Sequence, residues 1–89
     1  MAVSFAQSIV PLFRPTDVTC MKRYGVLLDD YAYMSDPAGD GTYADHANAR
    51  DVHAHLTGAM PPQMPMGGPF WSSDQLKTFD QWMTDGFLA

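Results

Sequence analysis

The sequence predicts an all-α fold, a small bundle of three to four helices joined by long loops rich in proline and glycine. Segments 42–58 and 72–86 begin at capping residues, end at glycines and carry apolar residues at helical spacing. No stretch of any length alternates apolar and polar residues as a strand would. The 89 residues, 46% of them hydrophobic, predict one domain over 1–89 with a small core.

The first two predicted helices lie in the amino-terminal quarter of the chain. One begins at Ser4 as N-cap and extends to Phe13, and Pro11 should end or bend it because proline lacks the N–H that a helix needs. The other is capped by Thr16 and stopped by Gly25. Both are therefore expected to be short.

A loop with a single helical turn, at about residues 29–34, should separate them from the clearest helix. That helix can be capped by Thr42 and closed by Gly58, and no proline interrupts it. Spacing of three and four residues gives it a modest face that can pack on a neighbour. This face consists of Ala49, Val52, His53 and Leu56.

The last predicted helix has the strongest local signals. Ser72 and Gln75 have the spacing of a capping box, Asp74 suits the first turn, and Gly86 is the expected carboxyl-terminal stop. Its apolar residues recur at helical spacing, which predicts one buried face. This face consists of Leu76, Phe79, Trp82 and Met83.

Charge and cysteine content exclude several classes of protein. Five basic side chains against ten acidic ones give a net charge of −5, which phosphate backbones would repel, so we expect no nucleic-acid partner. The single cysteine, Cys20, rules out an internal disulfide. We expect no membrane span, and the first residues lack the pattern of a signal peptide, so the interpretation is a cytoplasmic protein.

The loop "GAMPPQMPMGGPFWSSDQ" holds three methionines in eighteen residues. Met60, Met64 and Met66, with His53 and Cys20, offer soft ligands of the kind that Cu(I) prefers. The competing interpretation, which we favour, is that the methionines fill gaps beneath the loop. The three histidines include no pair at the i, i+4 spacing that two ligands of one ion need on a helix. We therefore expect no bound metal or other cofactor.

No catalytic constellation is evident. A nucleophilic Cys20 would need a base supplied by the fold, and nothing in the sequence predicts one, so we interpret it as a buried small hydrophobic residue. The acid pair Asp29 and Asp30 is more typical of solvated loop residues than of general acid and base partners. A small hydrolytic enzyme is consequently the third of three functional hypotheses.

The order of three motifs resembles class I cytochrome c domains. The opening "FAQSIVPLF", the segment "PTDVTCM", and "GAMPP" before the last helix would correspond to the first helix, the haem-attachment segment and the loop of the axial methionine, here Met60. The attachment motif requires two cysteines followed by a histidine, whereas this segment has one cysteine and no histidine. The resemblance therefore implies the fold without covalently attached haem.

A closer likeness is to haem-less cytochrome-c-like bacterial domains. Their opening motif matches Phe5 to Phe13, their glycine-rich Met-Pro segment matches Met64 to Gly68, and the closing motif matches Trp71, Gln75, Phe79 and Trp82. Such domains occur alone or beside larger redox or metal enzymes, which implies an accessory role. In this resemblance Pro69, Phe70 and Trp71 would fold over the space that a porphyrin occupies.

The first hypothesis is thus a non-catalytic accessory or protein-interaction domain. Its partner would be a redox or metal enzyme, or a second copy of the chain, and aromatic side chains would serve as anchors. The candidate anchors are Tyr31, Tyr33, Phe70 and Trp71. The second hypothesis is an electron-transfer domain that binds copper or non-covalent haem through the soft ligands named above.

Overall fold

The computed structural model describes residues 3–61, 64 and 70–89. It is 54% helix, and the described residues include no strand, so the all-α prediction is confirmed. The helical segments are η1 (Phe5–Ile9), η2 (Val10–Leu12), α1 (Pro15–Lys22), α2 (Tyr31–Met34), α3 (Ala47–Thr57) and α4 (Ser73–Thr84).

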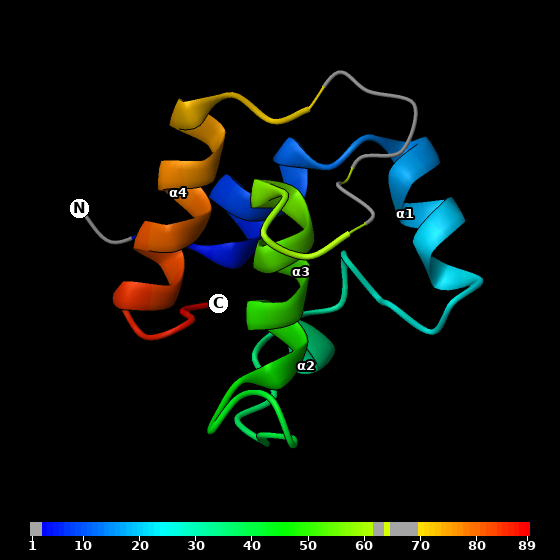
Figure 1. Cartoon of the computed structure of the whole chain (residues 1–89). Helices are drawn as coiled ribbons and strands as arrows, with labels where there is room; N and C mark the ends of the chain where they lie inside the picture. Colours follow the sequence, from blue (N-terminus) through cyan, green and yellow to red (C-terminus); the bar gives the residue numbers. More distant parts are fainter. Residues whose placement is uncertain (1–2, 62–63, 65–69) are drawn as a thin grey trace.

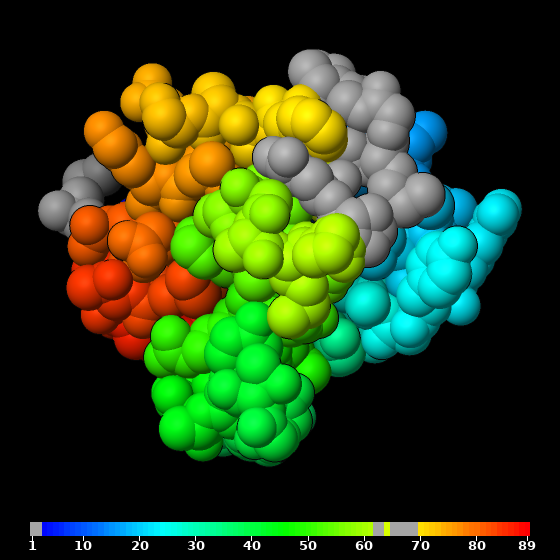
Figure 2. Space-filling model, in the orientation of Figure 1, coloured from blue at the N-terminus to red at the C-terminus, as the bar shows by residue number. Residues whose placement is uncertain are grey.

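Helix α3 lies at the centre, between α4 on one side and α1 on the other (Figure 1). It contacts both α4 and α2, and α4 also contacts η1. The space-filling view shows the atoms of the α3 region between those of α4 and those of α1 and the turn after it (Figure 2). The two flanks of α3 therefore face different surroundings.

The first helix is shorter and wider than an α-helix. Ser4 caps it as predicted, because its hydroxyl accepts a hydrogen bond from the N–H of Gln7 at 3.1 Å. The segment is a π-turn, in which the Val10 N–H donates to the carbonyl of Phe5, followed by a 3-10 turn that contains Pro11. Proline cannot donate the hydrogen bond that an α-helix would place there, so the α-helix expected over this segment does not form.

Helix α1 begins before the predicted cap. The N-cap is Arg14 and not Thr16, and Pro15 takes the first helical position, where its missing N–H costs nothing. The Asp17 carboxylate accepts a hydrogen bond from the Arg14 N–H at 3.3 Å and pairs with its guanidinium at 2.9 Å. After the helix, Gly25 has a φ of 77°, so the predicted stop lies in the turn that follows.

Helix α3 also starts later than expected. The predicted cap, Thr42, lies in a loop, where its N–H and that of Tyr43 both donate to the Asp40 carboxylate at 2.8 Å. The N-cap is His46, in the left-handed region with a φ of 47°. The carboxyl-terminal stop is correct, since Gly58 has a φ of 83°.

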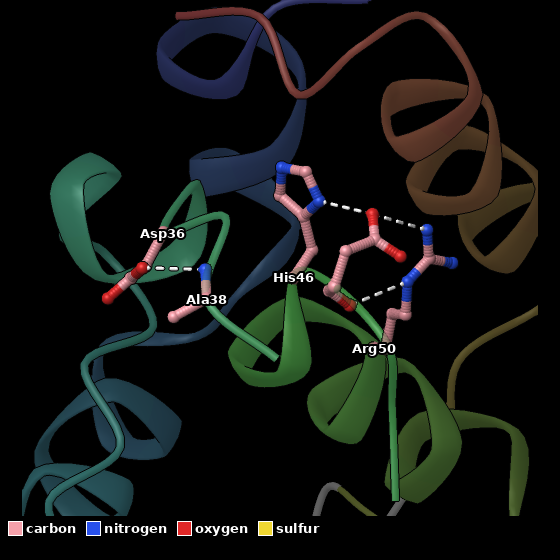
Figure 3. A network of polar contacts seen from close by, with 5 residues as sticks. Asp36, Ala38, His46 and Arg50 are labelled. Carbon is pink, nitrogen blue, oxygen red and sulfur yellow. Dashed lines mark hydrogen bonds and ion pairs between the residues drawn. The ribbon is translucent and has the colours of Figure 1, made fainter. Parts of the chain in front are cut away.

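A polar network fixes this start of α3 (Figure 3). The Asp45 carboxylate lies 2.6 Å from His46 Nδ1 and 3.3 Å from an Arg50 guanidinium nitrogen, and Arg50 Nε donates to the Asp45 carbonyl at 3.0 Å. These contacts with His46 and then Arg50 lower the pKa of Asp45. In the preceding loop the Asp36 carboxylate accepts from the Ala38 N–H at 2.9 Å.

Two other local predictions are confirmed. The turn near residue 30 is α2, capped by Asp30, whose carboxylate accepts from the Ala32 N–H at 3.0 Å. Helix α4 has the predicted capping box, with the Ser72 hydroxyl and the Gln75 side chain each accepting the other residue's N–H, at 3.2 and 2.8 Å.

The core joins α4 and α3 to both ends of the described chain. Its largest fully buried side chains are Trp82, Phe79, Ile9, Leu28, Met34 and Leu56. The Phe5 N–H donates to the Leu88 carbonyl at 2.9 Å, and the indole of Trp82 donates to the same carbonyl at 2.8 Å. The carboxyl-terminal residues thus complete the core beside η1.

Candidate functional site

An apolar pocket of about 420 Å³ lies between the end of α1 and one face of α3. A volume of this size is within the range of binding pockets in proteins. It is lined by Met21, Tyr24, Val26, Asp51, Val52, His55 and Met64. Five of these seven side chains are apolar or aromatic, and the two polar ones are on α3.

One wall is the turn that ends α1. The Met21 carbonyl accepts hydrogen bonds from the N–H groups of Tyr24, at 3.0 Å, and Val26, at 3.1 Å. Gly25 permits this tight reversal because its positive φ is unstrained only for glycine. The turn brings Met21 and Val26 to the pocket and leaves Tyr24, which is 71% exposed, at its edge.

The opposite wall is α3. Val52 is only 4% exposed and joins the pocket to the core. Asp51 and His55 are one turn apart, with Asp51 Oδ2 3.7 Å from His55 Nε2, and their side chains are 45% and 20% exposed. This wall therefore places one carboxylate and one imidazole beside an apolar surface.

Met64 closes the pocket from the segment after α3. Its N–H donates to the His55 carbonyl at 2.9 Å, which ties it to the last turn of the helix. Its side chain is 4% exposed and belongs to the core cluster. Met64 thus contributes as a gap-filling methionine would, at the point where the core meets the pocket.

The other soft ligands that the sequence offered do not meet at this pocket. Cys20 lines a groove of α1 together with Pro15, Thr16, Thr19 and Arg23. It is partly exposed, so the expectation of a buried thiol is wrong. Met60 is half-buried, and Met66 lies outside the described residues.

His53 points to the opposite flank of α3. It lines a groove of about 470 Å³ that also contains Tyr43, Asp80 and Met83. Its ring stacks on Phe79 with centroids 5.6 Å apart, and burial lowers its pKa. In the described part of the chain, no three His, Cys, Asp or Glu side chains form a group that could hold a metal ion.

Of the predicted anchors, Phe70 is the most exposed, at 54%. The Tyr31 hydroxyl donates to the Phe87 carbonyl at 2.7 Å, and its side chain is 38% exposed. Tyr33 is partly buried, and burial followed by the charge of Asp51 raises its pKa.

Trp71 is 8% exposed and contacts Phe13 and Phe79, with centroids 5.1 and 6.1 Å away. It is therefore a core residue and not an exposed anchor, as its place in the closing motif implied. Tyr24 was overlooked by the sequence reasoning. The sequence signal that could have identified Tyr24 is its place as an aromatic residue just after α1, a helix without an apolar stripe that would bury it.

No family model, curated protein or solved structure matches the chain. Among the described residues, none of the helices is long and apolar enough to cross a bilayer. The function is therefore inferred from the chain's own residues and from the pocket that they form.

Proposed function

We propose that this chain is a non-catalytic protein-interaction domain that receives an apolar side chain of a partner protein in the pocket between α1 and α3. The observation that carries the proposal is the exposed ring of Tyr24 at the edge of an apolar pocket. Exposed aromatic side chains beside pockets are typical anchors of protein interfaces.

The chemistry of the pocket walls supports a protein side chain as the occupant. Met21 and Met64 are flexible and polarizable, so they adapt to the shape of an inserted group. Val26 and Val52 add apolar surface, whose removal from water on docking provides the driving force. The pocket is large enough for a single aromatic or branched aliphatic side chain.

The grooves around the reactive side chains support a non-catalytic role. The described residues that line the groove of Cys20 include no histidine and no carboxylate that could activate the thiol. His53 stacks on Phe79, and its groove contains no cysteine among the described residues. A small hydrolytic enzyme built on these two residues is thus disfavoured.

The accessory role beside a redox or metal enzyme comes from the resemblance to haem-less cytochrome-c-like domains. Two residues of the closing motif, Phe79 and Trp82, are fully buried in the core, as that resemblance would require. The cytochrome-c-like fold itself is part of this proposal.

A second candidate function is supported by a specific observation. Met21, His55 and Met64 line the same pocket, and thioethers with an imidazole are ligands that suit Cu(I). Only Met64 belongs to the soft set expected from the sequence. Competition for Cu(I) against a chelator of known affinity, with wild type and Met21→Leu, tests this candidate directly.

Site-specific photo-crosslinking in cells of the source organism tests the interaction role. A photoreactive phenylalanine analogue replaces Tyr24 in one protein and Leu88, which is 40% exposed, in a control protein. We expect one discrete crosslinked protein from position 24 and none from position 88. Met21→Glu should abolish that product, whereas Thr19→Glu, an exposed position of the same helix, should preserve it.

Two results would overturn the proposal. A product that survives Met21→Glu would show that the pocket is not the docking site. A product that consists of two copies of this chain would replace the accessory role with self-association.

A further inference from the structure

We infer that the partner segment presents an aromatic side chain with a lysine or arginine beside it, the ring entering the pocket and the cation facing Asp51. This inference rests on the proposed function and specifies the chemistry of the partner. It follows from the apolar walls of the pocket and from the sign of the charge at its edge.

The aromatic part follows from the methionines. Met21 and Met64 lie on different segments and both line the pocket, so a ring placed there would lie beside two thioether side chains. Sulfur–aromatic contacts are favourable beyond the apolar area that they bury. A ring also fills the width of a pocket more completely than a short aliphatic side chain, and complete filling excludes water.

The cationic part follows from the charges. Asp51 is the one carboxylate among the described lining residues, and neither lysine nor arginine is among them. Its distance of 3.7 Å to His55 is longer than a hydrogen bond, so the carboxylate can still accept one from a partner's ammonium or guanidinium group. With its side chain 45% exposed, Asp51 is accessible to such a group.

Two further features favour a cation over an anion. The Tyr24 ring lines the same pocket and is 71% exposed, and the face of an accessible aromatic ring attracts a positive charge. The net charge of −5 attracts a basic segment during encounter and repels an acidic one. A partner with an acidic residue beside its anchor should therefore bind less well.

Four capped dipeptides isolate these two parts. N-acetyl-Phe-Lys-amide carries both features, N-acetyl-Phe-Gln-amide and N-acetyl-Phe-Glu-amide change the charge, and N-acetyl-Ala-Lys-amide removes the ring. Each is titrated into the full chain carrying ¹³C-methyl methionine, and NMR follows the methyl signals of Met21 and Met64. The methyl signals of Met34, which is fully buried, and Met83, which lines the other groove, serve as internal controls.

We expect the Phe-Lys compound to shift the Met21 and Met64 signals and to bind about two- to fivefold tighter than the Phe-Gln compound, the range of an exposed ion pair. The Phe-Glu compound should bind more weakly still, and the Ala-Lys compound should leave both signals in place. Asp51→Asn should remove the advantage of lysine over glutamine. The matched variant Asp80→Asn, an exposed carboxylate of α4, should preserve it.

The outcomes separate this inference from the function on which it rests. Equal binding of the Lys, Gln and Glu compounds would overturn the charge inference while the pocket remained a docking site. Equal shifts from the Ala-Lys compound would overturn the aromatic anchor. If position 24 crosslinks a partner but no phenylalanine compound shifts Met21 or Met64, the inference fails and the interaction role stands.

Discussion

Phe87 packs into the core near the carboxyl terminus, and its backbone conformation is strained. Substitutions at this position can measure that strain. It is not a glycine, yet its φ is 58°, and its side chain is only 6% exposed. Its ring stacks on His46 with centroids 3.8 Å apart and meets Trp82 edge to face at 5.1 Å. The backbone is held as well, because the Phe87 carbonyl accepts the Tyr31 hydroxyl and its N–H donates to Trp82.

Phe87→Ala and Phe87→Gly remove the same ring and differ only by the β-methyl group, which controls the backbone conformations that each residue can adopt. Losing a buried phenylalanine ring should lower the free energy of unfolding by about 3–5 kcal/mol in both variants. Alanine keeps the cost of the left-handed backbone conformation, roughly 1–2 kcal/mol, because it has a Cβ atom. Glycine has no Cβ atom and does not pay this cost. Glycine loses about 0.5–1 kcal/mol through its freer unfolded chain. The glycine variant should therefore be more stable than the alanine variant by roughly 0–1.5 kcal/mol, the reverse of the usual order.

Urea unfolding followed by tryptophan fluorescence measures the comparison. Both variants are studied with the same concentration of a stabilising osmolyte, so that each begins from a folded state. The same difference in the free energy of unfolding should give Phe87→Gly a melting temperature a few degrees above that of Phe87→Ala. If Phe87→Gly is instead less stable than Phe87→Ala by 0.5–1 kcal/mol, as at an ordinary helical position, the assignment of strain to Phe87 is wrong.

Two further predictions concern the cap of α4 and the imidazole on the far flank of α3. Ser72→Ala should lower the free energy of unfolding by about 1 kcal/mol, because the capping bond is lost, whereas Ser73→Ala should change it by less than about 0.5 kcal/mol in the same urea assay. The pKa of His53 is lowered by burial, so the unfolded chain binds the proton more readily. The stability due to neutral His53 is fully present above about pH 6.5 and is lost as the pH falls through the lower folded pKa. His53→Phe, which keeps a ring on Phe79, should flatten this dependence in urea unfolding between pH 7.5 and 5; an unchanged slope would assign it to another group.

The features that the sequence predicts correctly depend on neighbours along the chain. The capping box of Ser72 and Gln75 needs only three residues, and the stop at Gly58 needs only glycine's access to positive φ. Their energies are local, so the pattern alone is sufficient. The same holds for the cap at Ser4, although the proline after it changes the kind of helix.

The start of α3 was mispredicted because other interactions determine it. Thr42 has a suitable side chain for a cap, but its N–H already donates to Asp40 in a turn. His46 starts α3 in a left-handed conformation that is accompanied by stacking on Phe87, which lies 41 residues further along the chain. No local pattern encodes a contact of that separation.

The residues of the pocket likewise divide into those that the sequence predicts and those that only the tertiary structure reveals. Met64 was expected as a gap-filling residue, and its position follows from one hydrogen bond to the last turn of α3. Met21 and His55 were not expected beside it, because their approach depends on how the turn at Gly25 directs the chain back towards α3. Composition could identify the kinds of side chain, but only the tertiary arrangement brings them together.

This arrangement also separates Tyr24, at the edge of the pocket, from the residues that stabilise the fold. The aromatic contacts of the core join Phe5, Phe79, Trp82 and Phe87 on the side of η1 and α4, whereas α1 contributes no fully buried residue. Tyr24 is 71% exposed, so replacing it with serine removes little buried surface and should change the free energy of unfolding by less than about 0.5 kcal/mol. The same change removes the aromatic group at the pocket edge and should weaken capture of the partner. If Tyr24→Ser instead unfolds the chain as readily as a core substitution, Tyr24 stabilises the fold, and its exposure gives no support to a docking role.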